Sequence, residues 1–68
     1  MTQMRINGAE VELSVMTVAE LLLDRGVDPA ARFLAVAVNG IVVRRSEWSS
    51  KLLAPGDAIE IVRPFSGG

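Results

Sequence analysis

The first part of the chain alternates apolar and polar residues around a tight-turn signal. Residues 4–6 precede Asn7-Gly8, and over residues 9–13 a valine and a leucine alternate with two glutamates. An Asn-Gly pair readily adopts positive φ at both central positions of a two-residue turn. An alternation of period two with one polar face is typical of an antiparallel strand that is solvated on one side. The pattern therefore predicts a β-hairpin.

The apolar spacing changes to a helical period after Thr17. The Thr17 hydroxyl can accept a hydrogen bond from the Glu20 amide, and the Glu20 side chain can reach back to Thr17, which makes a capping box. The apolar residues of the following turns share one stripe: Val18, Leu21 and Leu22. Gly26 suits the left-handed conformation that ends many helices. We therefore expect a helix that begins at Thr17 and is ended by Gly26.

The second half of the chain repeats the strand signals. Phe33–Val38 is the most apolar segment and predicts a strand, and Asn39-Gly40 turns it back into Ile41–Val43. Pro55-Gly56 suits the central positions of a type II turn. Ala58–Arg63 follows this turn and is the last predicted strand.

A polar stretch separates these strands and contains one tryptophan. Ser46 is expected to cap a short helical turn there. Trp48 predicts a half-buried aromatic side chain at the edge of a thin core, and a contact with a partner is the alternative. For Arg44 and Arg45 we expect solvated side chains, and the alternative is a basic spot for an acidic partner.

The order of these elements predicts an α+β fold. A hairpin followed by a helix places a later strand beside the first one, so the first and last strands should be parallel and central. The expected architecture is a β-grasp, a mixed sheet of four to five strands with one helix across one face. Because proline cannot donate to a strand ladder, pairing should end at Pro64. We expect one domain, residues 1–64, and a flexible tail, residues 65–68.

Composition narrows the chemistry that the chain can perform. Its 68 residues include no cysteine and no histidine, which excludes Cys/His zinc sites, cysteine nucleophiles and histidine-based triads. A formal net charge of −1 is unlike the basic footprint of nucleic-acid-binding domains. The longest apolar run is too short to span a bilayer, and the N-terminus lacks the apolar region of a signal peptide. We therefore expect a cytoplasmic protein without nucleic-acid or membrane partners.

The chain end carries the one unusual chemical feature. The acidic residues are scattered and are expected to be surface charges. Glu10 and Glu12 share one strand face where a metal could bind, but two carboxylates without a third ligand are a weak signal, so no catalytic or metal residue is predicted. At the terminal Gly67-Gly68 the only functional group is the α-carboxylate of Gly68. Adenylation by ATP would make one of its oxygens part of a leaving group, and glycine lets backbone enter a narrow active site. A frayed end without function is the alternative.

One face of the predicted sheet is a candidate partner-binding surface. By alternation, four residues of two neighbouring strands face away from the helix: Ala35, Ala37, Glu60 and Val62. Their mostly small side chains predict a flat platform near the tail. Phe65 follows the last strand, either as an exposed anchor for the partner or folded back on the domain. Ser66 links it to the two glycines.

Several segments together resemble one known family. They run from the helix to the chain end: Thr17–Leu22, Val36–Gly40, Val42-Val43, Arg45, Trp48, Pro55–Asp57, Ile59–Val62 and Gly67-Gly68. Over nearly its whole length the chain resembles the ThiS family, the ubiquitin-like β-grasp sulfur carriers of thiamine biosynthesis. The stretch from the second Asn-Gly to the tryptophan is fairly specific to that family. The Gly-Asp turn and the diglycine are shared with other β-grasp carriers.

The resemblance implies a protein cosubstrate and not an enzyme. A ubiquitin-activating-type enzyme would adenylate Gly68 with ATP and magnesium, and a sulfur donor protein would supply sulfur for the thiocarboxylate. The carrier would then deliver this sulfur to the thiazole synthase, and the chain itself would bind no cofactor. Two alternatives stay open at this point. One is the small subunit of molybdopterin synthase, and the other is a non-catalytic ubiquitin-like binding module.

Overall fold

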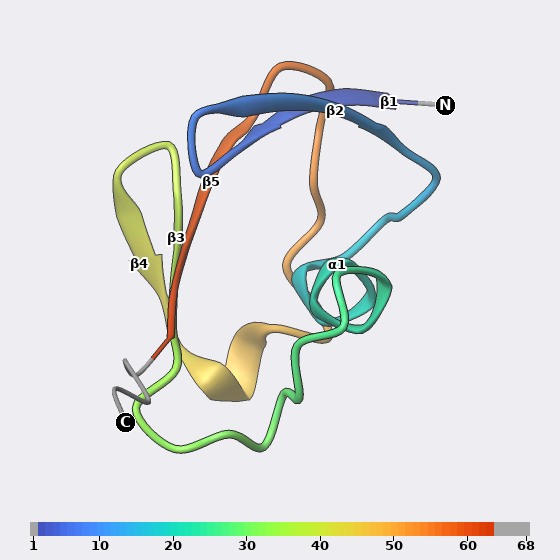
Figure 1. The fold of residues 1–68 in the computed structure, drawn as a ribbon. Coiled ribbons are helices and arrows are strands. Elements are labelled where there is room, and N and C mark those ends of the chain that lie inside the picture. Colours follow the sequence, from blue (N-terminus) through green and yellow to red (C-terminus); the bar gives the residue numbers. More distant parts are fainter. Residues whose placement is uncertain (1, 64–68) are drawn as a thin grey trace.

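Five strands form one mixed sheet in the computed structural model, which describes residues 2–63 (Figure 1). In chain order the strands are β1 (Thr2–Ile6), β2 (Ala9–Leu13), β3 (Ala35–Val38), β4 (Ile41–Val43) and β5 (Ala58–Val62). The α-helix α1 (Val18–Asp24) lies between the two hairpins in sequence, and the 3-10 helix η1 (Arg45–Glu47) follows β4. The order of strands across the sheet is β2-β1-β5-β3-β4.

The first and last strands of the chain lie side by side in the interior of the sheet. β1 and β5 run parallel, with Arg5 opposite Ala58 and Ile6 opposite Ile59. β2 pairs antiparallel with β1, and β3 pairs antiparallel with β5. This arrangement confirms the predicted β-grasp with its parallel central pair. The predicted boundary at Pro64 and the tail of residues 65–68 lie outside the described residues.

Both Asn-Gly turns have the conformation that the sequence predicts. φ is 49° at Asn7 and 87° at Gly8, and it is 53° at Asn39 and 83° at Gly40. Positive φ at both central residues is the mark of a type I′ turn, whose twist matches that of the flanking strands. The turns therefore fix the registers of β1 with β2 and of β3 with β4.

The ends of α1 are closed by hydrogen bonds that the sequence also predicts. The Glu20 amide donates to the Thr17 hydroxyl at 3.2 Å, and the Thr17 amide donates to the Glu20 carboxylate at 3.2 Å. At the other end Gly26 has φ of 73°, and the Val27 amide donates to the Leu22 carbonyl at 2.8 Å. These bonds satisfy backbone groups that a short helix leaves free. They confirm both predicted ends.

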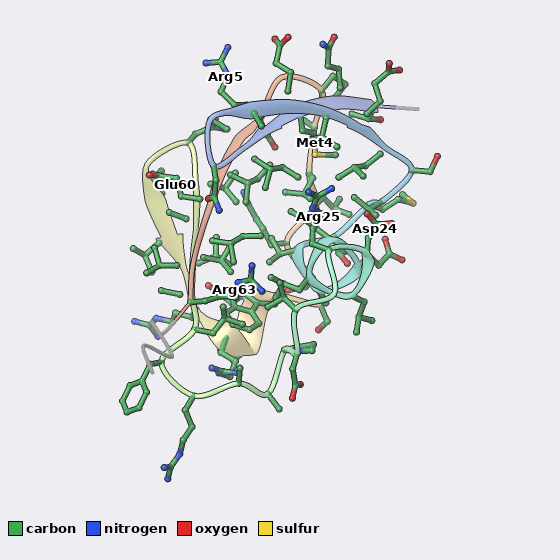
Figure 2. The ribbon with its side chains drawn as sticks, in the orientation of Figure 1. Met4, Arg5, Asp24, Arg25, Glu60 and Arg63 are labelled. Carbon is green, nitrogen blue, oxygen red and sulfur yellow. The ribbon has the colours of Figure 1, made fainter. Side chains whose placement is uncertain are left out.

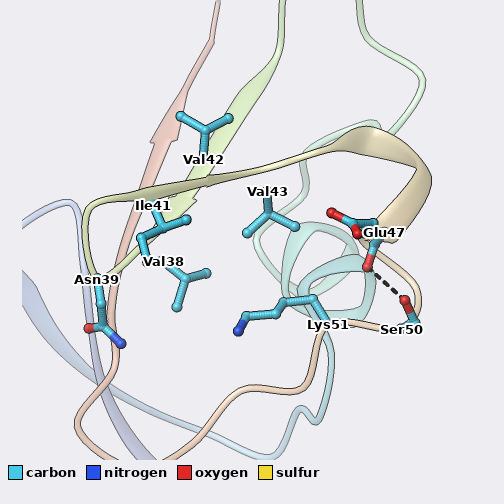
Figure 3. Close-up of a pocket in the computed structure, with 8 residues that line it drawn as sticks. All are labelled: Val38, Asn39, Ile41, Val42, Val43, Glu47, Ser50 and Lys51. Carbon is cyan, nitrogen blue, oxygen red and sulfur yellow. Dashed lines mark hydrogen bonds between the residues drawn. The ribbon is translucent and has the colours of Figure 1, made fainter.

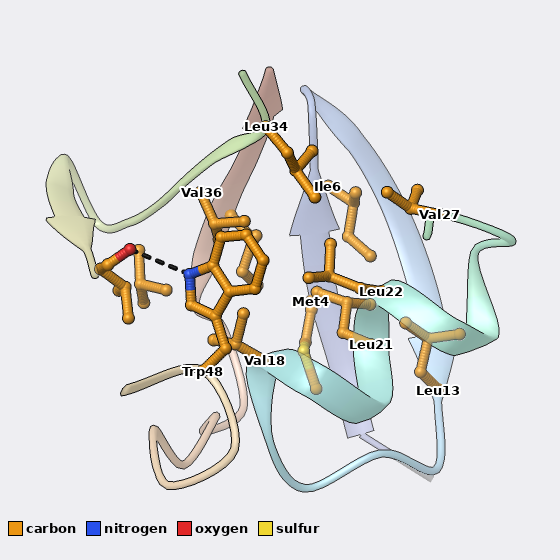
Figure 4. Close-up of a cluster of buried hydrophobic side chains, with 13 residues drawn as sticks. Met4, Ile6, Leu13, Val18, Leu21, Leu22, Val27, Leu34, Val36 and Trp48 are labelled. Carbon is orange, nitrogen blue, oxygen red and sulfur yellow. Dashed lines mark hydrogen bonds between the residues drawn. The ribbon is translucent and has the colours of Figure 1, made fainter. Parts of the chain in front are cut away.

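The core lies between α1 and the sheet (Figure 4). Its most deeply buried side chains come from both layers: Met4, Val18, Leu21, Leu22, Val36 and Ile59. Within residues 2–63 no polar or charged residue is buried. The interior of the described chain is therefore apolar packing, and any chemistry must be sought on its surface.

Trp48 belongs to this core more completely than the sequence predicts. Its side chain is 3% exposed, and its indole N–H donates to the Val43 carbonyl at 2.9 Å (Figure 4). The Arg45 guanidinium lies 4.7 Å from the ring centroid and donates to the carbonyls of Pro29 and Ala31, the latter at 2.6 Å. Arg45 is exposed, as expected, but its guanidinium also binds two loop carbonyls and lies over an aromatic ring, contacts that the sequence does not predict.

Two predicted local details are wrong. β3 begins at Ala35 and not at Phe33, because Phe33 has φ of 60°, which is incompatible with an extended strand. Ser46 does not cap the helical turn, since it lies inside η1. The N-cap is two residues earlier, at Arg44, whose carbonyl accepts from the Glu47 amide at 2.8 Å.

Candidate functional site

The sheet face that points away from α1 carries the predicted contact residues, and we call it the outer face. In the register of β3 against β5, Ala35 lies opposite Val62. Ala37 lies opposite Glu60, two residues further along. The residues between them on both strands point toward α1 and belong to the core or pack against it. The structure therefore brings all four predicted strand residues together on one surface.

The outer face divides into an apolar half and a charged half. Val42 of β4 lies opposite Ala37 and extends the apolar half to the sheet edge. On the other side Arg5 of β1 lies opposite Glu10 of β2, with 4.0 Å between their charged groups. Figure 2 shows Arg5 and Glu60 directed away from α1. Glu60 thus places one carboxylate within the apolar half. This single charge allows a partner to recognise one orientation of the surface.

The apolar half reaches the end of β5, where the chain continues toward its C-terminus. Val62 is 60% exposed and is the last residue of β5. The α-carboxylate proposed from the sequence belongs to Gly68, five residues beyond Arg63. The other predicted tail residues, Phe65, Ser66 and Gly67, lie with it outside the described residues. The described part of the candidate site is therefore the surface from which the tail departs.

Two asparagine side chains hold β5 in place, a role that the sequence analysis missed. The Asn7 side-chain oxygen accepts from the Ile61 amide at 2.8 Å, and its nitrogen donates to the Ile61 carbonyl at 3.3 Å. On the other side of β5 the Asn39 side-chain oxygen accepts from the Ala58 amide at 2.9 Å. Each amide extends a backbone ladder past the end of its strand. The sequence contains one signal for this role. Both turns have Asn and not Asp at the first central position, and an Asn side chain can donate hydrogen bonds as well as accept them.

Replacing Asn7 by Gly should loosen β5 without breaking the turn. Glycine adopts the positive φ of this position, but both side-chain hydrogen bonds to Ile61 are lost. We expect the free energy of unfolding to fall by about 1–2 kcal/mol in urea titrations. Hydrogen exchange at the Ile61 amide should accelerate more than exchange at Ile59. Asn7→Asp is the control, since it keeps the acceptor for the Ile61 amide. Unchanged exchange at Ile61 in Asn7→Gly would contradict the assignment.

The other surface features of the described residues include a pocket and scattered charged side chains. A pocket beside β4 is lined by apolar side chains together with Glu47, Ser50 and Lys51 (Figure 3). The Ser50 hydroxyl is engaged with the Glu47 carbonyl at 3.2 Å. Residues 2–63 contain no group of three or more side chains able to hold a metal ion. The described helices include none that is long and apolar enough to cross a membrane.

Comparison with known proteins matches both the sequence and the fold. The family model of the ThiS family matches residues 2–68. A crystal structure and an NMR structure of the thiamine biosynthesis protein (ThiS) from Geobacter metallireducens each superpose with a TM-score of 0.80 at 27% sequence identity. Each match covers 98% of this chain, and it covers 100% of the crystallised chain and 88% of the NMR chain. Among curated proteins no match is found.

Proposed function

The chain belongs to the ThiS family, and from this membership we propose that it carries sulfur for thiamine biosynthesis on its C-terminal glycine. The observation that carries the proposal is the family match over residues 2–68, a range that includes Gly67-Gly68. The similarity to two structures of a thiamine biosynthesis protein supports the same pathway. These matches favour the thiamine carrier over a molybdopterin synthase subunit and over a binding module without chemistry.

The proposed chemistry takes place at the α-carboxylate of Gly68. One carboxylate oxygen attacks the α-phosphorus of ATP in a partner enzyme that uses magnesium, pyrophosphate leaves, and an acyl adenylate forms. A sulfur nucleophile at the oxidation level of sulfide then attacks the acyl carbon and displaces AMP, which leaves a thiocarboxylate. The bond formed is carbon to sulfur, and the bond broken is carbon to the phosphate oxygen. The thiocarboxylate afterwards serves as the sulfur source for the thiazole synthase.

In this scheme the carrier acts as a cosubstrate and not as a catalyst. Its contribution is to present the terminus and to offer a surface that partners bind. The apolar half of the outer face, with Ala35, Ala37, Val62 and the carboxylate of Glu60, adjoins the end of β5. A protein that takes up the tail therefore contacts this half first, and we propose these residues, with Phe65, as its binding surface.

The test is a sulfur-loading assay read by intact-mass spectrometry. The full chain is incubated with its adenylating enzyme, ATP, magnesium and sulfide. We expect the mass to rise by the difference between one sulfur and one oxygen atom, with the change confined to the C-terminal peptide. The reaction without ATP is the control. An unchanged mass, or sulfur located in another peptide, would refute the proposal. The loaded chain should support thiazole formation by the thiazole synthase, and no activity should appear with a molybdopterin synthase large subunit.

Replacing Val62 by Glu should weaken the binding of the adenylating enzyme. Val62 is 60% exposed, so a charged side chain fits there without entering the core, but it must be desolvated when the apolar half is covered. We expect the Kd to rise about tenfold, in line with ~1.4 kcal/mol, in isothermal titration calorimetry. Phe65→Glu should act in the same direction.

Leu52→Glu is the matched control for this experiment. Leu52 is a comparably exposed apolar residue, 64% exposed, outside the sheet and close to Thr17 at the start of α1. The same change there should leave the Kd unaltered. An equal loss of affinity in Val62→Glu and Leu52→Glu, or no loss in either, would contradict the assignment of the binding surface.

A further inference from the structure

Phe33 stands out among the described residues in two ways. Its φ of 60° is in the left-handed region, where glycine is common and a bulky residue is a rare outlier. Its side chain is 81% exposed, more than any other large apolar side chain in residues 2–63. Backbone strain and an aromatic ring in water both disfavour this arrangement in the isolated chain. Such outliers persist where the surroundings impose them, and they concentrate at functional surfaces.

The surroundings impose the conformation from both sides. On the N-terminal side, Arg45 binds the carbonyls of Pro29 and Ala31 and so fixes the loop. On the C-terminal side, Leu34 is buried in the core at the entry to β3. Phe33 lies in a turn between these two fixed points, with its ring exposed. The backbone at Phe33 is therefore held in one conformation, and the ring extends from a fixed position on the surface.

The position of Phe33 relates it to the proposed site. Phe33 precedes Ala35 by two residues, and Ala35 lies opposite Val62, the last residue of β5. Opposed residues are about 5 Å apart in an antiparallel pair, and two residues of chain add at most ~7 Å. Figure 1 shows the segment that leads into β3 passing beside the end of β5. Phe33 thus adjoins both the apolar half of the outer face and the point where the tail departs.

Exposed cations flank this aromatic side chain. Arg32 precedes it in sequence. Arg44 follows β4, whose Val43 lies opposite Val36, so Arg44 is at the same end of the sheet as Ala35. Within residues 2–63 neither Arg32 nor Arg44 has a carboxylate within 4.0 Å. An exposed aromatic residue with free guanidinium groups beside it is complementary to an apolar pocket that is bordered by carboxylates.

We propose that Phe33 is an anchor residue for the enzyme that adenylates Gly68, and that Arg32 and Arg44 pair with acidic side chains around the pocket that receives it. This inference rests on the proposed function. Residues 64–68 span at most about 17 Å, so the active site that acts on Gly68 must lie within that reach of Arg63. The enzyme surface around its active site then covers the residues that surround the end of β5. The adenylating enzyme is the first protein that the unmodified carboxylate must meet.

Phe33→Asn is the variant that tests this proposal. Asparagine tolerates the left-handed conformation, so the midpoint of thermal unfolding should stay unchanged or rise. The Kd for the adenylating enzyme, measured by isothermal titration calorimetry, should increase about 30-fold, as expected for a central aromatic contact. Phe33→Tyr should bind like the unmodified chain because it keeps the ring. Arg32→Ala combined with Arg44→Ala should reduce the dependence of the Kd on salt.

Leu23→Asn is the matched control, because Leu23 is an exposed apolar residue of α1, 67% exposed, on the layer opposite to the outer face. Its Kd should equal that of the unmodified chain. A Phe33→Asn chain that binds normally, or a Leu23→Asn chain that loses as much affinity, overturns the anchor. Lost affinity for the thiazole synthase alone overturns it as well. If the unmodified chain gains no sulfur, the proposed function itself fails; if it loads sulfur and Phe33→Asn binds normally, only the anchor fails.

Discussion

Deletion of Gly68 should abolish sulfur loading while the folded domain keeps its stability. The deletion moves the terminal carboxylate back by about 3.3 Å, and a misplacement of even 1 Å at a reacting centre can cost about 100-fold in rate. The retracted carboxylate of Gly67 therefore no longer reaches the α-phosphorus of ATP in the adenylating enzyme. Intact-mass analysis of the loading reaction should show no sulfur in the shortened chain. Its thermal unfolding should match that of the full chain, since the core is built from residues within 2–63.

Two substitutions in the tail complete this experiment. Gly67→Val keeps the length of the tail but adds a branched side chain where the channel is proposed to accept only backbone, so loading should be strongly slowed. Ser66→Ala keeps the length and adds no bulk, and loading should proceed as in the unmodified chain. Normal loading of the chain without Gly68 would show that the terminal glycine is not the reacting residue.

Replacing Trp48 by Ala should unfold most of the protein. The side chain is 3% exposed, and truncation of a buried tryptophan typically costs about 3–5 kcal/mol. Small domains have about 5 kcal/mol of stability at the lower end of the usual range, so little remains. The loss extends beyond the cavity, because Arg45 stacks on the ring while it holds the Pro29–Ala31 loop. Circular dichroism in a urea titration measures the effect without relying on tryptophan fluorescence.

Trp48→Phe separates the packing of the ring from its hydrogen bond. Phenylalanine fills much of the same volume but leaves the Val43 carbonyl without the indole N–H. The expected loss is about 1–3 kcal/mol, the usual penalty for one unsatisfied buried group, and the domain should stay folded. A Trp48→Ala chain whose urea midpoint equals that of Trp48→Phe would show that the aromatic packing contributes little.

The elements with local signals were predictable from the sequence. Asn-Gly turns, a capping box and a terminating glycine each specify backbone geometry through residues that are near neighbours in the chain. The order of these elements then leaves few topologies, and the parallel pairing of β1 with β5 follows. The outer face was predictable for the same reason, because alternation along a strand decides which side chains share a surface.

The features that the sequence could not predict depend on contacts between distant segments. Phe33 begins the apolar run that continues into β3, and only the fixed loop before it and the buried Leu34 after it explain why it is not part of the strand. From the sequence Arg45 is expected to be a surface charge, and its hydrogen bonds to the carbonyls of Pro29 and Ala31 are apparent only in the folded chain. Asn7 reads as a turn residue until β5, more than 50 positions later, is placed beside it. Pairwise contacts of this kind leave no periodic pattern in one sequence.

The placement of β5 has a mechanical consequence for a carrier whose end is proposed to be drawn into another protein. A pull on the C-terminal segment is applied along β5, while its hydrogen bonds to β1 and β3 run across the direction of the force. Such bonds are loaded in shear and share the force, whereas a strand pulled from a sheet edge breaks its bonds one after another. The asparagine amides at Ile61 and Ala58 add rungs on both flanks. A pull on the C-terminus is therefore expected to load many hydrogen bonds of β5 at once and not to separate the strands one bond at a time.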